Sequence, residues 1–226
     1  MIRYDFLPIV AISPRNGYFT RENIGFAIDK TLVEYGRVAV MVMDTIAAWN
    51  WQALGYDVKI SERKARLDGN NYKNRVYRHC QFKGYTKQQV NILNWTPDIN
   101  SSSIYQEYLK SIWFLYINNS MFRNDIRQAT RSFIENAMSR VKKYSERIDD
   151  IEVAVDIACQ YIISEIAFFD SAYKIYSESG VNLIYHRPFE VYENYVIGKY
   201  TPGKKSHMGF HIITTGAILP AKLAIA

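Results

Sequence analysis

The chain contains little cysteine, and it lacks the apolar segments that mark membrane and secreted proteins. Cys80 and Cys159 are the only cysteines among 226 residues, neither belongs to a CxxC pair, and four histidines accompany them. Two isolated thiols do not provide the ligands of a zinc site, and they fit a reducing compartment. No apolar run approaches about 18 residues, and no charged start precedes an apolar leader. We therefore expect a cytoplasmic protein with no metal ion.

Sequence motifs of two common α/β classes are also missing. Neither GxGxxG nor GxxxxGK[ST] follows the first apolar run, so the phosphate-binding loop of a nucleotide-binding fold is absent. Ser13 stands in Ala-Ile-Ser-Pro-Arg, which lacks both glycines of the GxSxG elbow that presents the serine of α/β-hydrolases. Judged by its neighbours alone, Ser13 is either a turn residue or a candidate nucleophile. No cofactor is expected.

Short apolar runs alternate with helix-like segments along the chain. The runs predict five buried strands, at residues 6–13, 38–43, 90–94, 182–186 and 209–214. Helices are predicted between them, at residues 20–34, from 49 into a basic stretch, and at 103–117, 122–144 and 149–177. This alternation predicts an α/β fold: a single Rossmann-like domain with a mostly parallel five-stranded sheet flanked by helices. We place this domain at residues 1–216 and expect residues 217–226 to be a frayed or non-native tail.

Basic residues are concentrated between residues 59 and 87. This stretch holds nine lysines and arginines and two acids, a net charge of +7, whereas the whole chain carries +6. So few acids leave few ion pairs within a helix, which favours a surface for a polyanion over an ordinary solvated helix face. Tyr72 and Tyr77 alternate with the basic residues, as aromatic side chains often do on nucleic-acid surfaces. Gly69-Asn70-Asn71 predicts a break in this helical stretch.

One carboxylate stands in apolar surroundings on a predicted helix. Glu165 lies within the sequence IISEIAFF (162–169). An ionised carboxylate in such a place is unfavourable unless a cation or hydrogen-bond donors satisfy it. Tyr161 is four residues earlier, on the same helix face. The pair predicts either a seat for an ammonium group or a structural ion pair with a lysine or arginine.

Polar residues follow several of the predicted strands. Ser13, Asp44, Asn94 and the pair Tyr185-His186 each stand where a strand ends. Ligands of an open parallel sheet bind at the carboxyl ends of its strands. The sequence therefore predicts a serine, a tyrosine and a histidine beside one crevice.

Three separated motifs together resemble the cyclodipeptide synthases. They are ISPRNGYF (12–19), YIISE (161–165) and Tyr185-His186, and the likeness extends to the strand ending in Met43-Asp44-Thr45 and to the basic helix. The order and spacing of these motifs, which cover most of the chain, carry the resemblance. It implies a fold similar to the catalytic domain of tyrosyl- and tryptophanyl-tRNA synthetases. It also implies that no ATP is needed, because the amino acids arrive already activated on tRNA.

The resemblance implies a role for each motif. Ser13 would accept the first aminoacyl group as an ester. Tyr161 and Glu165 would hold the ammonium group of that aminoacyl group, and Tyr185 would orient the reacting ester and assist proton transfer. In this ping-pong scheme a second aminoacyl transfer gives a dipeptidyl-enzyme, which cyclises to a diketopiperazine.

Two further residues and two departures refine the match. Asn16 and His186 correspond to the branch of the family with Asn, Tyr and His at three characteristic places, where they would position Tyr185. Ala11 stands where a glycine is common before Ile-Ser, and it would narrow the first aminoacyl pocket. The basic stretch is also less dense than in the most basic members.

Two groups of binding residues are expected as well. Apolar residues near the second strand and on the Glu165 helix are candidates to line the first aminoacyl pocket, with plain core packing as the alternative: Met41, Met43, Phe168 and Phe169. Basic residues of the 59–87 stretch are candidates to contact the acceptor arm of tRNA: Lys64, Lys73, Arg75 and Arg78. The first group predicts an apolar first amino acid.

The expected partners are two aminoacyl-tRNAs per cycle, with no membrane and no metal, and the enzyme is expected to be a monomer. Two other functions stay open on the residues alone. One is a tRNA-binding or editing module in which Ser13 is a turn residue. The other is an α/β-type esterase that uses Ser13 and His186. Charged tRNA incubated with the protein separates the three, because only the synthase would release a cyclic dipeptide.

Overall fold

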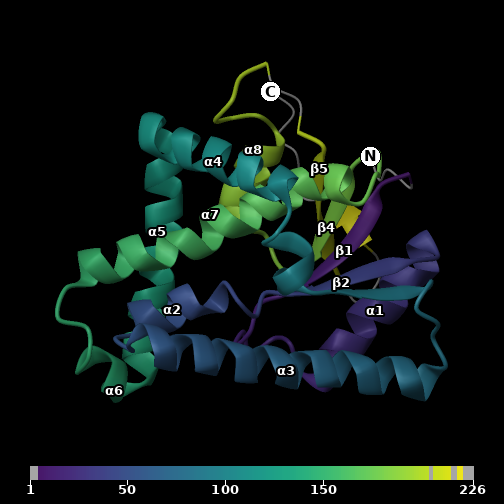
Figure 1. Ribbon diagram of the computed structural model, residues 1–226, viewed down its shortest axis with the longest axis horizontal. Helices are drawn as coiled ribbons and strands as arrows, with labels where there is room; N and C mark the ends of the chain where they lie inside the picture. The colour runs from purple at the N-terminus through teal and green to yellow at the C-terminus, as the bar shows by residue number, and fades with distance from the viewer. Residues whose placement is uncertain (1–4, 204–205, 215–217, 221–226) are drawn as a thin grey trace.

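A mostly parallel sheet separates the helices of the protein into two layers (Figure 1). The computed structural model describes residues 5–203, 206–214 and 218–220. Within these residues, six strands are hydrogen-bonded in the order β3-β2-β1-β4-β5-β6. The first five run parallel, and β6 pairs antiparallel with β5. The strands are β1 (Leu7–Ile12), β2 (Val38–Val42), β3 (Val90–Leu93), β4 (Val181–Tyr185), β5 (Met208–Ile213) and β6 (Ile218–Pro220).

Helices connect the parallel strands and cover both faces of the sheet. The helical elements are α1 (Arg21–Tyr35), α2 (Ala47–Ala53), α3 (Val58–Lys83), η1 (Trp95–Ile99), α4 (Ser103–Asn118), α5 (Ser120–Arg140), α6 (Lys142–Ser145), α7 (Ile151–Ile175) and α8 (Glu190–Val196). Core residues of α1 and of the second half of α3 pack on one face, whereas those of α2, α4, α5 and α7 pack on the other, together with Ala65 from the first half of α3 (Figure 1). The predicted α/β class is confirmed.

Both faces of the central strands are buried, which explains their continuous apolar runs. Successive side chains of a strand point to opposite faces. In β1, Ile9 and Ala11 belong to the core under α7, whereas Val10 and Ile12 belong to the core under α1. A strand covered by helices on both faces has no polar alternation to show.

Local capping explains where two of the helices begin and end. Thr20 accepts a hydrogen bond from the backbone N–H of Asn23 at the start of α1, and Gly36 ends that helix with a left-handed φ of 73°. The carboxylate of Asp150 accepts from two backbone N–H groups at the start of α7. In the described part of the chain, no helix is long and apolar enough to cross a membrane.

The basic helix α3 is continuous, so the prediction of a break at Gly69-Asn70-Asn71 is wrong. Gly69 is needed because α3 lies against the end of β2. A Cβ atom at residue 69 would come within 2.1 Å of the Cβ of Asp44. The glycine therefore reports a close approach between two elements, and it does not interrupt the helix.

Two other differences from the predicted elements concern short segments. The helix predicted at 122–144 is divided into α5 and α6 at Val141, whose φ and ψ are extended. We expected residues 217–226 to be a tail, yet Ile218–Pro220 form β6 on the edge of the sheet. Residues 217 and 221–226 of that segment lie outside the described residues.

Candidate active site

A cavity of about 820 Å³ lies at the carboxyl ends of β1 and β4. Strands are added to one side of β1 first and to the other side from β4 onward, so the strand order reverses between them. Such a reversal leaves a crevice in which parallel sheets bind ligands. Ser13 follows β1 and Tyr185 ends β4, and both line this cavity together with Tyr161 and Glu165 of α7. The fold thus brings these four predicted residues together.

The hydroxyl group of Tyr161 is buried beside Ser13 without a hydrogen-bond partner. Ser13 and Glu165 are close enough to influence the pKa of Tyr161, although neither meets hydrogen-bond geometry with it. Burial raises this pKa well above its usual value, so the hydroxyl stays protonated. A buried polar atom without a partner is unfavourable, and a polar group of a ligand would satisfy it.

Glu165 is the buried carboxylate of the site, with 6% of its surface exposed. Burial raises its pKa to about 7, although the nearby hydroxyl groups of Tyr192 and Tyr161 act to lower it. Tyr192 of α8 donates a hydrogen bond to Glu165 Oε2. No ion pair involves Glu165 within the described residues. The structural ion pair that the sequence left open is therefore not found.

Asn16 connects the loop after β1 to the end of β4. Its Nδ2 donates to Tyr185 Oη at 3.2 Å and lies 3.5 Å from Nε2 of His186. The ring of His186 stacks on Tyr18 with 4.1 Å between centroids. Burial raises the pKa of Tyr185, so this group remains a hydroxyl at neutral pH.

His186 is poorly suited to act as the base of a serine esterase. Burial lowers its pKa to about 4, so it is a weak proton acceptor at neutral pH. The hydrogen bonds of the described residues do not join it to Ser13, and its Nε2 faces Asn16 instead. Its position fits a residue that holds Asn16 and Tyr185 in place.

Three of the four residues expected to line the first aminoacyl pocket lie in the core instead. Met41, Met43 and Phe168 are fully buried and do not line the cavity, whereas Phe169 does. Phe168 packs against Trp95 at 5.7 Å between centroids. The sequence identified apolar residues near the site but not the direction of their side chains. The apolar residues that do line the cavity include Ala11, Ala47, Trp51, Ile162 and Leu183.

Lys73, which we expected to contact tRNA, is a structural residue. Its Nζ forms an ion pair with Asp44 Oδ2 at 2.7 Å and donates to Asn94 Oδ1 at 3.2 Å. Its side chain is 15% exposed. Lys73 therefore fixes α3 to the ends of β2 and β3 and does not face a ligand.

The other three predicted tRNA contacts have different surroundings. Arg75 Nη1 donates to the carbonyl oxygen of Phe19 at 2.8 Å and so ties α3 to the segment after Ser13. Lys64 lies over the ring of Trp51 at 4.4 Å. Arg78 is exposed. Other exposed basic residues of α3 are Lys59, Arg63, Arg66 and Lys83, the last of which pairs with Asp29.

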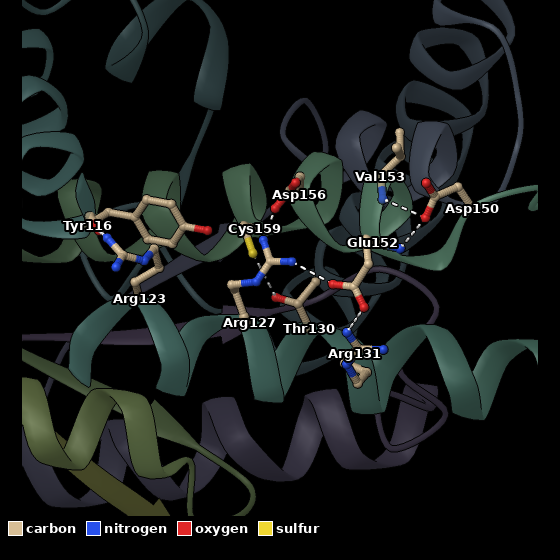
Figure 2. Close-up of polar contacts among 10 residues, drawn as sticks. All are labelled: Tyr116, Arg123, Arg127, Thr130, Arg131, Asp150, Glu152, Val153, Asp156 and Cys159. Atoms are coloured by element: carbon tan, nitrogen blue, oxygen red, sulfur yellow. Dashed lines mark hydrogen bonds and ion pairs between the residues drawn. The ribbon is translucent and has the colours of Figure 1, made fainter. Parts of the chain in front are cut away.

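Helix α5 forms another wall of the cavity. Its lining residues are mostly polar: Asp125, Gln128, Ser132, Asn136 and Arg140. Elsewhere α5 is joined to α7, because Arg127 pairs with Glu152 at 2.7 Å and also with Asp156, and Arg131 pairs with Glu152 (Figure 2). The carboxylates of this network are exposed, so each pair adds little to stability. The network links two helices that line the cavity.

Tyr192 is the residue of this site that the sequence did not indicate. It belongs to α8, a seven-residue helix that we did not predict. The available signals were Pro188 shortly before the helix and the spacing of Tyr192 and Tyr195 on one helix face. Neither signal connects Tyr192 to Glu165, because that contact depends on the tertiary fold.

The chemistry of the site restricts its substrate. Among the described residues, no histidine is hydrogen-bonded to Ser13, so the site suits an ester that is already activated. No ion pair of the described residues supplies a cation to Glu165, so this carboxylate suits a substrate that carries an amine. Aminoacyl esters meet both requirements. The fold and the site together define an α/β acyltransferase acting on activated amino acids.

The cyclodipeptide synthase family model matches residues 8–215, and the chain belongs to this family. It is an aminoacyl-tRNA-using transferase that makes cyclic dipeptides. The chain is 23% identical to the cyclo(L-leucyl-L-leucyl) synthase of Bacillus subtilis (strain 168), over 91% of this chain and 81% of that protein. It is 20% identical to the protein of the same name from Staphylococcus haemolyticus (strain JCSC1435), over 91% and 86%.

Solved structures of low sequence identity have the same fold. A cyclodipeptide synthase from Bacillus thermoamylovorans superposes with a TM-score of 0.72 at 21% identity, covering 96% of this chain and 90% of that one. A Mycobacterium tuberculosis protein, whose structure relates cyclodipeptide synthetases to type I tRNA synthetases, gives 0.71 at 16% identity, covering 96% and 87%. The predicted relation to class I synthetases is confirmed at the level of the fold.

Proposed function

We propose that the protein makes its cyclic dipeptide by a ping-pong mechanism in which Ser13 is the nucleophile. One observation carries the proposal: Ser13, Tyr161, Glu165 and Tyr185 line the same cavity at the switch point of the sheet. A single serine at that point can hold one aminoacyl group while the first tRNA leaves and the second arrives.

In the first step Ser13 Oγ attacks the ester carbonyl carbon of an aminoacyl-tRNA. The bond between this carbon and the ribose oxygen breaks as the serine ester forms, and the serine proton ends on the ribose oxygen. Tyr185 is a protonated hydroxyl near Ser13, so it can pass this proton by accepting one and donating another. Asn16 and His186 keep the Tyr185 ring in place.

Glu165 and Tyr161 hold the amino group of the enzyme-bound aminoacyl ester. An ammonium ion there supplies the cation that the Glu165 carboxylate lacks and a donor for the unpaired Tyr161 hydroxyl. A carboxylate with a pKa of about 7 also accepts the proton of this ammonium group readily at neutral pH.

The amine freed in this way attacks the ester of a second aminoacyl-tRNA. The second tRNA leaves as its ester bond breaks, the proton lost by the attacking amine ends on the ribose oxygen, and a dipeptidyl group remains on Ser13. The terminal amine of the dipeptide then attacks the Ser13 ester. This last step closes the ring and returns the serine hydroxyl.

The first amino acid is apolar, and leucine is the leading candidate. Ala11, Ala47, Ile162 and Leu183 line the cavity and offer no charged partner to a side chain. The two curated relatives are named as cyclo(L-leucyl-L-leucyl) synthases. A competition between leucyl-tRNA and other charged tRNAs tests this choice. The mass of the cyclic dipeptide that forms shows which amino acids the enzyme has joined.

The protein acts in our proposal as a single-domain monomer of the cytoplasm, where charged tRNAs are found. Lys64, Arg75 and Arg78 lie on α3, the helix that would face the acceptor arm. Size-exclusion chromatography with light scattering tests the monomer, and a stable dimer would contradict it.

Ser13→Ala tests the nucleophile. We expect the variant to bind tRNA normally and to lose covalent labelling by radiolabelled aminoacyl-tRNA, because the acceptor oxygen is gone. Ser132→Ala, at another serine that lines the cavity, is the matched control and should still be labelled. Labelling of Ser13→Ala would contradict the proposal. Release of free amino acid by the wild-type protein would favour an editing enzyme, and labelling by simple esters alone would favour an esterase.

A further inference from the structure

Aromatic rings and cations alternate in a stack that begins at the cavity wall, and the mechanism above does not use it. The guanidinium of Arg15 lies 4.0 Å from the ring of Trp51 and 5.4 Å from that of Tyr144. Lys64 Nζ lies 4.4 Å from Trp51 and 4.7 Å from Tyr56, and Arg147 lies 4.4 Å from Tyr56. We call these residues the cation stack: Tyr144, Arg15, Trp51, Lys64, Tyr56 and Arg147.

Six segments contribute one residue each to the cation stack. Arg15 comes from the loop after β1, Trp51 from α2, and Lys64 from α3. The remaining members come from α6, from the α2–α3 turn and from the loop before α7. Helix α6 accordingly lies beside the beginning of α3 (Figure 1). Packing of distant segments, and not local sequence, gathers the three cations.

The three cations have no acidic partners. Among the ion pairs of the described residues, none involves Arg15, Lys64 or Arg147. Asp68 is nearby but accepts a hydrogen bond from Trp51 Nε1 at 3.2 Å. Rings attract cations to their faces without neutralising them. The cation stack therefore keeps a net positive charge, with three cations beside the single carboxylate of Asp68, and this charge suits an anion.

Arg15 retains donors for a ligand. One bond is made by its side chain, from Nη2 to Tyr144 Oη at 2.7 Å. A guanidinium that stacks on a ring keeps the N–H groups at its planar edge free for a phosphate. Its backbone has a φ of 68°, a left-handed conformation that is rare outside glycine, and its N–H donates to Tyr72 Oη at 3.2 Å. Such strain is concentrated at functional sites.

The cation stack leads away from the proposed nucleophile. Arg15 is two residues from Ser13, and Arg15, Trp51 and Tyr144 line the cavity. In an aminoacyl-tRNA the ester is carried by the terminal ribose, so the phosphates of the unpaired 3′ end follow directly behind it. With the ester at Ser13, these phosphates have to leave along the rim of the cavity.

We propose that the cation stack binds the backbone phosphates of the unpaired 3′ end of the aminoacyl-tRNA. The strand runs from Ser13 past Arg15 toward Lys64 and Arg147. This assignment rests on the proposed function, because the placement of Ser13 at the ester sets the direction of the strand. It makes the site part of the RNA surface and separates it from the exposed side of α3.

Binding of uncharged tRNA tests the cation stack without requiring catalysis. Arg15→Gln and Arg147→Gln should each weaken binding of full-length tRNA, with Arg15→Gln about tenfold weaker. Each lost phosphate contact should reduce the slope of log affinity against log salt by about 0.7. For tRNA that lacks its last three nucleotides, the same variants should bind like the wild type.

Two controls separate this site from general electrostatics. Lys110→Gln removes an exposed positive charge from α4 and should leave the affinity for both the full-length and the shortened tRNA unchanged. Arg63→Gln, on the exposed side of α3, should lower the affinity for both tRNAs by the same factor. Thermal unfolding of each variant confirms that it is folded.

An equal loss of affinity for the two tRNAs in Arg15→Gln and Arg147→Gln, or no loss for either, would overturn the assignment. Failure of the proposed function has a different signature. In that case aminoacyl-tRNA would leave Ser13 unlabelled while the binding differences between the two tRNAs persist.

Discussion

Two buried carboxylates lie near the carboxyl ends of the sheet, and their surroundings are opposite. Asp44, after β2, is 9% exposed and is paired with Lys73, whose Nζ is also bonded to Asn94. Glu165 of α7 is 6% exposed, and its hydrogen-bond donor is the hydroxyl of Tyr192. The two groups are buried to a similar degree, so burial alone does not distinguish them.

In our proposal this difference separates a structural carboxylate, Asp44, from one that binds the substrate, Glu165. At Asp44 the protein supplies the cation, and the pair fixes α3 to the sheet. At Glu165 the protein supplies neutral donors alone, so the carboxylate is incompletely satisfied until a cation arrives. The expected consequence is that one residue matters for stability and the other for binding. Three substitutions test this contrast, from the largest expected effect to the smallest.

Lys73→Met should give the largest loss of stability. It removes the cation and leaves the Asp44 carboxylate buried, and breaking a buried pair in this way costs about 3 kcal/mol or more. Denaturant unfolding of the purified protein measures the change. Asp44→Asn with Lys73→Met in one chain is the control, since removal of both charges should recover part of the loss. Unchanged stability in Lys73→Met would contradict the structural role that we assign to the Asp44–Lys73 pair.

Glu165→Gln should have the opposite effect on stability. The folded-state pKa of about 7 lies above the ordinary value of 4.5. The wild-type protein therefore loses stability as pH rises from 4.5 through 7, because the unfolded chain ionises more easily than the folded one. Glutamine has no such penalty. At about pH 8 the variant should be more stable by up to about 3 kcal/mol.

The same variant should fail in catalysis. Glutamine cannot pair with an ammonium group, so aminoacyl transfer should fall by about 100-fold or more. Unfolding at about pH 5 and about pH 8 and the rate of Ser13 labelling are the two measurements. A variant that is both less stable at pH 8 and fully active would show that Glu165 is a structural residue like Asp44.

Tyr192→Phe should have the smallest of the three effects, a shift in the pH dependence of Ser13 labelling. The variant removes a donor that favours the ionised form of Glu165, so the pKa of Glu165 should rise further above 7, by about one unit. Tyr161 and Tyr185, the other groups that face Glu165, remain. The acidic limb of the labelling rate should move to higher pH. Tyr195→Phe on the same helix is the control, because Tyr195 bonds Asp170 instead. If the acidic limb of the pH profile stays at the same pH, Tyr192 does not influence the pKa of Glu165 and contributes packing alone.

The sequence allowed the parts of the fold that depend on local patterns to be predicted. Continuous apolar runs identified all five parallel strands, and Thr20 and Gly36 bounded the first helix. Strand ends identified Ser13 and Tyr185 as neighbours before the structure placed both at one cavity. Glu165 was recognisable because a charge within an apolar helix needs an explanation.

The remaining parts depend on packing between distant segments. Gly69 suggested a break because a glycine required by contact with Asp44 looks the same in sequence as one that ends a helix. Met41 and Met43 were expected at the pocket, but an apolar strand covered on both faces does not reveal which side chains reach a cavity. Lys73 looked like its basic neighbours until the structure placed it on Asp44.

The burial of α7 also bears on which part of the active site unfolds first. Every residue from Tyr161 to Ala172 is buried. Amides of such a segment exchange with solvent only when the whole domain unfolds, whereas partly exposed loops open by themselves. We therefore expect Glu165 to stay in place for as long as the fold persists, and the less buried turn that carries Ser13 to open more easily. If Ser13 is the nucleophile, as we propose, we expect transient inactivation to begin at the serine and not at Glu165.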